Sequence, residues 1–376
     1  VAHLSSQPIG QFNLQSWGFL AGSLVIFGLG VLDDIKHISP QAKLIGQISA
    51  AAIVILFGST TNFFTPILSN SLLADFLNLL LTFLWLVGIT NAINLLDNMD
   101  GLAGGIVLIT TGLLAFLFWR AGNAGLVLVC LALMGANLGF LWFNFPPARL
   151  FMGDSGSMFL GFTLAALAIA RQPQASNVFA ILAVPSLLFL LPILDTLLVT
   201  ITRLLRGASP VQGGRDHTSH RLIAFGFKER QVLVILYTAA LLSGVLAVMI
   251  ESAGYRLSLI LVPILVAAFA LAAAYLGGVK ISPPSEKNDL IALEHPVIPD
   301  GSEVRSPSLA QIVLNLTFKR RLLEVSLDFV IILLAFYLSF VTRYGLNLSE
   351  ERISYFLQAL PVALVVGYLS FFLNGV

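Results

Sequence analysis

The sequence is poor in charged residues. Asp, Glu, Lys and Arg make up only 10% of its 376 residues, whereas about a quarter of the residues of a soluble domain are charged. The two signs nearly balance, because the formal net charge is +1. This balance leaves no basic face for nucleic acid and no acidic face for cationic ligands. The composition therefore argues against a soluble domain and against a nucleic-acid partner.

Cysteine is nearly absent as well. The single Cys130 lies inside an apolar stretch, so the chain has neither an internal disulfide framework nor a cysteine metal cluster. Val rather than Met stands at position 1, and no signal-peptide pattern follows it. We therefore expect the first part of the gene product to precede this sequence.

Hydrophobic residues, by contrast, make up 57% of the chain and gather in long runs. A helix needs about 20 apolar residues to cross about 30 Å of hydrocarbon, or a few fewer with polar flanks. The unbroken apolarity of the runs rejects the alternating pattern of a membrane β-barrel. We predict an all-α fold, a polytopic transmembrane helical bundle. Its eleven expected spans are 16–32, 42–58, 72–90, 102–119, 124–143, 156–170, 178–201, 231–250, 257–277, 322–341 and 353–373.

These runs fall into three parts of the chain. Residues 1–277 are expected to form a first membrane domain with about nine helices. Residues 278–318 are rich in Pro, Ser and charge, which predicts a cytoplasmic linker. Residues 319–376 would begin a second membrane unit with two helices, whose basic start anchors it on the inner side.

The positive charges indicate the orientation of the bundle. When the loops are assigned alternately to the two sides of the membrane, fifteen of the twenty Lys and Arg residues fall on one side. The positive-inside rule makes that side cytoplasmic. All the unusual polar motifs of the sequence fall on the same side. We therefore expect these motifs to face the cytoplasm. The protein would cross the cell membrane many times.

Two adjacent carboxylates, Asp33 and Asp34, follow the first apolar run directly. A helix C-terminus carries partial negative charge, so these carboxylates stand against the dipole and against each other. A compensating positive charge is expected nearby. The pair would serve as a cation site, or as a base whose proton affinity is tuned by its twin. The plainer interpretation is a solvated helix end with Lys36 and Lys43 close by.

The stretch NAINLLDNMDGLAGG repeats a polar residue at every third position, namely Asn91, Asn94, Asp97 and Asp100. On a straight helix, steps of three drift by about 60° each, so the four side chains cannot share one face. We expect the stretch to bend around a ligand. The alternative is that these residues only tie membrane helices together. Their oxygens are hard ligands, which suit Mg²⁺ or Mn²⁺.

A third motif, NFPPARLFMGDSGS, leads into the next apolar run. Asp154 stands where it can cap a helix N-terminus, which is its plain interpretation. A helix N-terminus also binds anions, and Gly153 leaves the backbone amides accessible. Phe151 could offer its ring to a flat ligand.

The fourth motif is the loop at 202–230, which holds six basic residues together with His217 and His220. Arginines such as Arg221, beside glycines and histidines, favour phosphate binding. Two histidines at this spacing are a weak zinc signal, and no third soft ligand accompanies them. The plainer interpretation is a basic loop that only sets the topology.

Together, the four motifs favour transfer of a phosphorylated group from a soluble nucleotide to a membrane-embedded acceptor. Two like unit charges about 4 Å apart repel by on the order of 4 kcal/mol at an effective dielectric of 20. A divalent cation held by the carboxylates would remove most of that barrier between two phosphorylated reactants. The alternatives are a secondary transporter with polar residues in its membrane helices and a structural scaffold.

The motifs GVLDDIKHISPQAKL, NAINLLDNMDGLAGG, FMGDSGSMFLGF and DHTSHRL, in this order, resemble the polyprenyl-phosphate N-acetylhexosamine-1-phosphate transferases. This superfamily includes the initiating enzymes of teichoic acid, O-antigen and enterobacterial common antigen synthesis, and the MraY enzymes. The resemblance covers about residues 10–277. It implies transfer of a hexosamine phosphate, GlcNAc-1-phosphate above all, from UDP-N-acetylhexosamine to undecaprenyl phosphate in a bacterial inner membrane. UMP would be released, Mg²⁺ would be the cofactor with Mn²⁺ as its substitute, and a homodimer is left open.

Position by position, the resemblance implies a role for each polar residue. The expected catalytic residues are Asp33, Asp34, Asp97, His217 and His220, with one of the paired aspartates acting as the base. The expected substrate-binding residues are Asn91, Asp100, Phe151, Gly153, Arg221 and Lys43. The expected metal ligands are Asp154 and Asn94.

Two features depart from the common pattern of these enzymes. Ser219 stands where related enzymes usually carry the middle histidine of a His-x-His-His run. The loop also lacks three consecutive histidines, which argues against a muramoyl-pentapeptide donor.

Beyond the linker, residues 319–376 resemble the opening hairpin of membrane-bound nucleotide-sugar dehydratases and epimerases of the capsule type.

Overall fold

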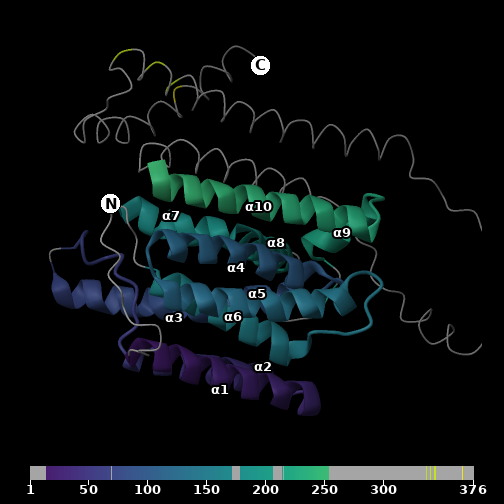
Figure 1. The fold of residues 1–376 in the computed structure, drawn as a ribbon, viewed down its shortest axis with the longest axis horizontal. Helices are drawn as coiled ribbons and strands as arrows, with labels where there is room; N and C mark the ends of the chain where they lie inside the picture. The colour runs from purple at the N-terminus through teal and green to yellow at the C-terminus, as the bar shows by residue number, and fades with distance from the viewer. Residues whose placement is uncertain are drawn as a thin grey trace, which may run out of the picture. The chain divides into compact units, whose positions relative to one another are not determined.

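The structure is a computed structural model that describes residues 14–68, 70–171, 178–205, 214 and 216–253, with the isolated positions 336, 339, 343 and 366. The chain divides into two compact units, Val1–Val262 and Pro263–Val376. The described residues of the first unit fold into helices joined by turns and contain no strand (Figure 1). This confirms the all-α prediction. The linker at 278–318 and the predicted spans at 257–277, 322–341 and 353–373 lie outside the described residues.

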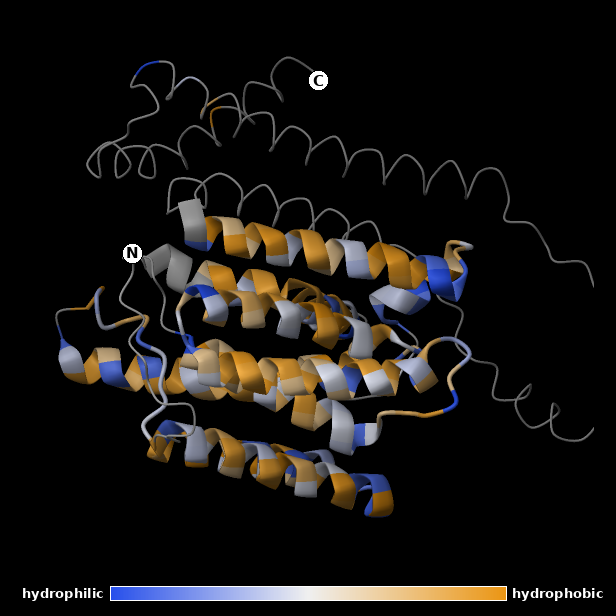
Figure 2. Ribbon diagram, in the orientation of Figure 1, coloured by the Kyte–Doolittle hydropathy of each residue, from blue (hydrophilic) through white to orange (hydrophobic). Residues whose placement is uncertain are grey.

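The described helices follow the predicted spans closely. Six are long and apolar enough to cross a membrane: α1 (Leu14–Lys36), α3 (Ser71–Leu96), α4 (Leu102–Arg120), α5 (Ala124–Asn144), α6 (Gly153–Ala170) and α10 (Glu229–Ala253). The shorter helices are α2 (Pro40–Leu56), α7 (Val178–Leu188), α8 (Leu190–Leu205) and α9 (Thr218–Ala224). Hydrophobic residues run along the helices, and polar residues gather toward helix ends (Figure 2). The first unit is therefore a polytopic helical membrane domain, as predicted.

The bundle is organised around two helix groups. In one group α6 packs against α1 and α3, and α2 packs against both α1 and α3. In the other, α4 packs against α5 and α10, and α10 packs against α7. Helix α5 lies at the edge of the bundle, because only 11% of its most apolar stretch is buried. The first group carries the end of α1, the start of α2 and the start of α6 into one neighbourhood.

A glycine allows α1 to lie directly against the first turn of α6. A Cβ atom on Gly30 would stand 2.4 Å from the Cα atom of Ser155, which is backbone and cannot turn aside. Lipid tails are as apolar as the helices, so the hydrophobic effect does not drive membrane helices together. Their association depends instead on close packing of small residues. Gly30 is therefore a requirement for the α1–α6 contact.

We expect Gly30→Ala to destabilise the fold by about 1–3 kcal/mol, the usual cost of inserting a methyl group into a filled contact. Thermal unfolding of the full chain in detergent, followed by intrinsic tryptophan fluorescence, would measure the loss. Gly28→Ala is the matched control in the same helix, because a Cβ atom at Gly28 meets no atom within 4 Å. Equal unfolding temperatures for the two variants would contradict the tight contact.

The predicted span at 178–201 is two helices rather than one, with the break at Phe189. Pro192 has no N–H, so the carbonyl oxygen of Leu188, four residues earlier, has no helical donor. The hydroxyl of Thr110 on α4 donates to that oxygen at 3.4 Å. The break is thus compensated by a neighbouring helix, as the polar backbone of a membrane protein requires.

Candidate functional site

Three charged side chains meet where α1 ends and where α2 and α6 begin. The Nζ atom of Lys43 contacts Oδ2 of Asp33 and lies 2.6 Å from Oδ2 of Asp154. The other oxygen of Asp33 accepts the backbone amide of Ile38 at 2.9 Å. The positive charge expected beside the paired aspartates is therefore Lys43, which one carboxylate from each of α1 and α6 shares.

Asp34 turns instead to the N-terminus of α6. Its two oxygens accept the backbone amides of Asp154 at 2.8 Å and of Ser155 at 3.1 Å. These are amides that a helix start leaves without partners, and the helix dipole favours a negative charge there. A side chain at Gly153, where φ is +66°, would stand 2.9 Å from the Asp34 carboxylate. Asp34 therefore caps the N-terminus of α6, a role that the sequence suggested for Asp154. The Asp154 carboxylate binds Lys43 instead.

The two asparagines of α3 have different partners. Asn94 donates its Nδ2 hydrogens to Oδ1 of Asp154 at 3.0 Å and to the hydroxyl of Ser157 at 2.8 Å. Asn91 exchanges two amide hydrogen bonds with Gln47 of α2, at 3.1 Å and 2.7 Å. Asn94 therefore joins the carboxylate cluster, whereas Asn91 ties α3 to α2. Binding of substrate by Asn91 stays a prediction.

The chain bends between α3 and α4, as the spacing of its polar residues predicts, and Gly101 has a φ of +77° there. Burial, followed by the negative charges of Asp154 and Asp100, raises the pKa of Asp97 to about 6. A carboxyl group with a pKa near neutrality can both take up and release a proton at physiological pH. Oδ2 of Asp100 accepts the backbone amide of Ala148 at 2.8 Å, which joins the bend to the α5–α6 loop.

The histidine motif lies on α9, a short helix that was not predicted. Asp195, buried in α8, accepts the backbone amide of Thr218 at 2.6 Å, and its second oxygen lies 2.8 Å from Nδ1 of His217. An ionised carboxylate only accepts, so this contact makes Nδ1 the protonated nitrogen and Nε2 the acceptor. His220 lies half-buried one turn further along α9. Asp195 thus fixes both the start of α9 and the His217 ring.

Ser219 links α9 to the bend after α3. Its hydroxyl donates to Oδ1 of Asn98 at 2.6 Å. Asn98 belongs to the same polar stretch as Asp97 and Asp100. It falls outside the pattern of every third residue and was therefore not among the predicted site residues. The serine that replaces the expected middle histidine therefore has a defined partner.

The arginines around α9 hold the loop. Arg203 donates to both carboxylate oxygens of Asp216, from Nε at 2.8 Å and from Nη2 at 2.5 Å. Burial raises the pKa of the Asp216 carboxyl, but the Arg203 guanidinium outweighs it and leaves the pKa below its usual range. Arg221 is fully buried and donates from Nε to the Asp216 carbonyl oxygen at 2.7 Å. This position anchors the loop, and contact of Arg221 with a diphosphate stays a prediction.

Phe151 stands on the loop before α6 with 74% of its surface exposed, so its ring is accessible to a flat ligand.

The residues that sequence reasoning missed are Asp216, Arg203, Asn98 and Gln47. Each acts through a partner at least 13 residues away in the chain. No local pattern could have indicated these pairs.

The magnesium ion that the sequence predicts at this cluster stays a prediction. Among the residues that the structure describes, no three Asp, Glu, His or Cys side chains converge closely enough to enclose a metal. Mg²⁺ seldom needs such an enclosure, because one or two carboxylates commonly hold it while water and substrate phosphates complete its shell. Asp154 is a carboxylate of this kind, whereas Asn94 turns its Nδ2 atom toward Asp154 and would have to rotate its amide to offer an oxygen to the ion. The negative charge that raises the pKa of Asp97 also favours a cation nearby.

Known proteins are similar in sequence to this part of the chain. The profile of glycosyl transferase family 4 matches residues 16–172, which include Asp33, Lys43, Asn94 and Asp154. The probable undecaprenyl-phosphate N-acetylglucosaminyl 1-phosphate transferase of Bacillus subtilis is 34% identical over 246 residues, which cover 65% of this chain and 68% of that relative. The chain belongs to glycosyl transferase family 4. The predicted superfamily is thereby confirmed.

Other relatives in glycosyl transferase family 4 differ in their named substrates. The decaprenyl-phosphate N-acetylglucosaminephosphotransferase of Mycobacterium tuberculosis is 36% identical over 242 residues, covering 58% of this chain and 59% of that relative. The phospho-N-acetylmuramoyl-pentapeptide-transferase of Halalkalibacterium halodurans is 32% identical over 256 residues, covering 64% of this chain and 77% of that relative. The family profile spans α1 to α6, and the histidine motif on α9 follows it in the chain.

Proposed function

We propose that this chain transfers N-acetylhexosamine-1-phosphate, GlcNAc-1-phosphate in particular, from a UDP-sugar to undecaprenyl phosphate and releases UMP. The observation that carries the proposal is the meeting of Asp33, Lys43, Asn94 and Asp154, from four helices, at one end of a membrane bundle. The Bacillus and Mycobacterium relatives, named for transfer of this sugar phosphate to undecaprenyl and decaprenyl phosphate, support the donor and the acceptor. The reaction would initiate a cell-envelope polysaccharide.

In this reaction an oxygen of the lipid phosphate attacks the β-phosphorus of the UDP-sugar. The bond from that phosphorus to the oxygen bridging toward the α-phosphate breaks, and UMP leaves with the electron pair. Because both reactants are negatively charged, catalysis depends on positive charge and on in-line placement of the reactants. Lys43 brings a positive charge to the cluster, and Asp33 and Asp154 fix its position.

Asp97 is the carboxyl group best suited to accept a proton from the lipid phosphate. Burial raises its pKa to about 6, so this carboxyl can take up a proton near physiological pH. Asp34, whose two oxygens are taken by amides of α6, acts as a positioning residue. The resemblance gives one of the paired aspartates, Asp33 or Asp34, as the base, and Asp33 holds Lys43.

Asp154 and Asn94 would hold Mg²⁺, or Mn²⁺ in its place, and the bound ion would neutralise charge on the diphosphate. His217, oriented by Asp195, would reach the diphosphate or the sugar, with His220 beside it on α9. Since UDP-sugars are soluble and the positive-inside rule assigns the side of these motifs to the cytoplasm, the site would face the cytoplasm of a bacterial cell. A homodimer also stays a prediction.

A secondary transporter is the alternative from another class. Such a protein would place its acidic residues near the middle of the bilayer, whereas Asp97 and Asp154 lie at helix ends. The chemistry of a carboxylate cluster beside a basic loop is explained by phosphoryl transfer and not by transport.

The test is turnover by the purified full chain in lipid nanodiscs with Mg²⁺. We expect UMP release only when UDP-GlcNAc and undecaprenyl phosphate are both present, and mass spectrometry should show the lipid diphospho-sugar. UDP-GalNAc and the UDP-muramoyl-pentapeptide are parallel donors that define the sugar. Failure to form a lipid-linked product from any of the three donors would overturn the proposal, and uptake of intact UDP-sugar into vesicles would favour the transporter.

A further inference from the structure

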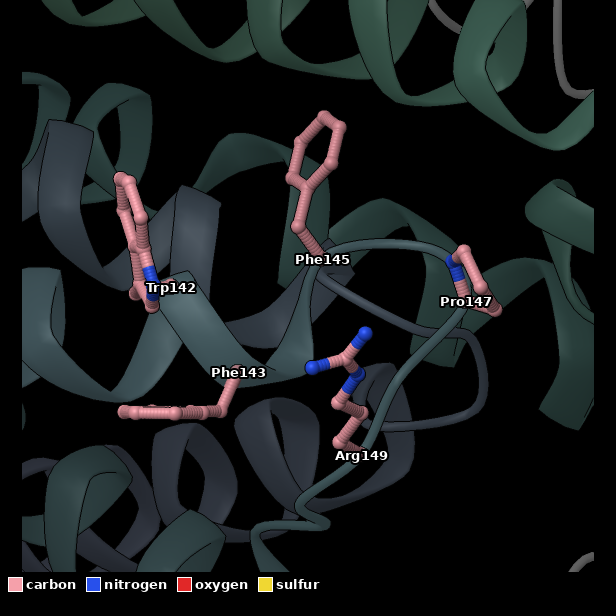
Figure 3. A pocket seen from close by; sticks show the side chains of 5 residues that line it. All are labelled: Trp142, Phe143, Phe145, Pro147 and Arg149. Atoms are coloured by element: carbon pink, nitrogen blue, oxygen red, sulfur yellow. The ribbon is translucent and has the colours of Figure 1, made fainter.

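A pocket of about 290 Å³ opens at the end of α5, and none of its lining residues belongs to the carboxylate cluster. Figure 3 shows its lining, which is Trp142, Phe143, Phe145, Pro147 and Arg149. In this view the guanidinium of Arg149 lies between the other lining residues, and the rings of Phe143 and Phe145 point away from it on two sides. The pocket thus combines one cation with three aromatic rings.

Three hydrogen bonds hold the backbone of the loop that carries Arg149. The amide of Arg149 donates to the carbonyl oxygen of Phe143 at 2.7 Å, which folds the loop back over the end of α5. Asn144 donates from Nδ2 to the carbonyl oxygen of Leu150 at 2.8 Å. One residue before Arg149, the amide of Ala148 is bound by Asp100. The loop is therefore anchored on both sides of Arg149, and the pocket is a built feature.

The pocket lies where a membrane surface would be. Helix α5 is the least buried of the six membrane-spanning helices, and Trp142 in its last turn is 83% exposed. Exposed leucines, Leu131 and Leu138, continue along the same helix toward its middle. Aromatic rings at the end of a spanning helix lie at the level of the lipid headgroups. The pocket therefore opens toward headgroups rather than toward the bundle interior.

The charge in the pocket has no carboxylate partner among the described residues. The Arg149 side chain that carries it is exposed. A guanidinium offers a planar fork of donors that matches two oxygens of a phosphate. An arginine without a carboxylate partner among the described residues, at headgroup level, is complementary to a lipid phosphate.

We propose that this pocket binds the phosphate of an anionic glycerophospholipid, whose acyl chains lie along the exposed face of α5. The exposed leucines accompany the pocket and suit acyl chains, which a soluble nucleotide lacks. The acceptor lipid must present its phosphate at the reacting cluster, whereas the pocket shares no lining residue with that cluster. The inference is independent of the proposed function, since it concerns a resident lipid and no reaction step.

Native mass spectrometry of the full chain in detergent with added phosphatidylglycerol or phosphatidylcholine tests the proposal. We expect the wild type to retain phosphatidylglycerol preferentially, and Arg149→Gln to weaken that retention about fivefold, the effect of one arginine near an anionic membrane surface. Arg149→Lys keeps the charge and should retain most of the binding. Lys228→Gln is the matched control, since Lys228 is exposed at the start of α10 and is absent from the pocket lining.

Three results would overturn the proposal. The first is equal retention of phosphatidylglycerol by the wild type and Arg149→Gln, at matched unfolding temperatures. The second is an equal loss in Lys228→Gln, which would indicate unspecific attraction to basic residues. The third is displacement of phosphatidylglycerol by stoichiometric undecaprenyl phosphate in the wild type but not in Arg149→Gln, which would make the pocket an acceptor site.

Discussion

Asp154→Asn is expected to reduce the turnover of UMP release by on the order of 10²–10³-fold, the usual effect of removing one preorganised electrostatic group. The substitution keeps the size of the side chain but removes the negative charge that faces Lys43 at 2.6 Å. It also replaces the proposed metal ligand by a weaker, neutral one. Asp33 would then be the sole carboxylate in contact with the Lys43 ammonium among the described residues. Both the lysine and the ion would lose their defined positions.

The measurement is UMP release by the full chain in nanodiscs over a series of Mg²⁺ concentrations. Part of the activity should return at high Mg²⁺ if Asp154 binds the ion, because a weakened site fills at higher concentration. Asp75→Asn is the matched control: it removes the same charge from an exposed position near the start of α3, at the opposite end of that helix from Asn94. Turnover of Asp154→Asn within twofold of the control would defeat the assignment.

The membrane helices could be predicted from the sequence because their cause is local. A run such as 72–90 is apolar over its whole length, and no distant residue is needed to make it a helix in lipid. The structure extends it to Ser71–Leu96. The extension carries Asn94 into the last turn, where backbone hydrogen bonding continues although the apolar pattern has ended. Boundaries are thus less predictable than spans, since polar residues at a helix end can belong to the helix or to the turn.

The site was predictable as a gathering of motifs but not as a set of contacts. Alternation of the loops placed Asp33, Asp97 and Asp154 on one side. The capping of α6 by Asp34, however, joins residues 120 positions apart and depends on the close approach that Gly30 permits. The motif around Asp154 matched a helix cap equally well by itself. Only the packing of α1 on α6 decides which of the two aspartates caps the helix.

Helix α9 shows the same limit. Its seven residues contain too few apolar positions for a periodic signal, and its start depends on the carboxylate of Asp195, buried in another helix. Asp195 lies inside an apolar run of the sequence, which gives no indication of its partner. The contact with His217, 22 residues later, explains why a buried carboxylate is kept there, because hydrogen bonds to an ionised group offset its desolvation.

Asp195→Asn is expected to lower the turnover number by about 10–100-fold, the typical effect of changing a group that orients a functional histidine. The asparagine oxygen can still accept the amide of Thr218, so the start of α9 should persist. Its amide nitrogen would face Nδ1 of His217 and would require Nδ1 to accept, which moves the ring proton to Nε2. The Nε2 atom would then change from acceptor to donor, and it could no longer accept a hydrogen bond from a hydroxyl of the sugar.

The turnover number, the Michaelis constant for UDP-GlcNAc and the unfolding temperature separate this effect from loss of structure. Asp216→Asn is the matched comparison, because it weakens the Arg203 pair in the same loop without touching the Nδ1 partner of His217. We expect Asp216→Asn to lower the unfolding temperature more than the turnover number, and Asp195→Asn to do the reverse. If both variants lost turnover in proportion to stability, the histidine would be held for the fold alone, and phosphoryl transfer would rest on the carboxylates and Lys43.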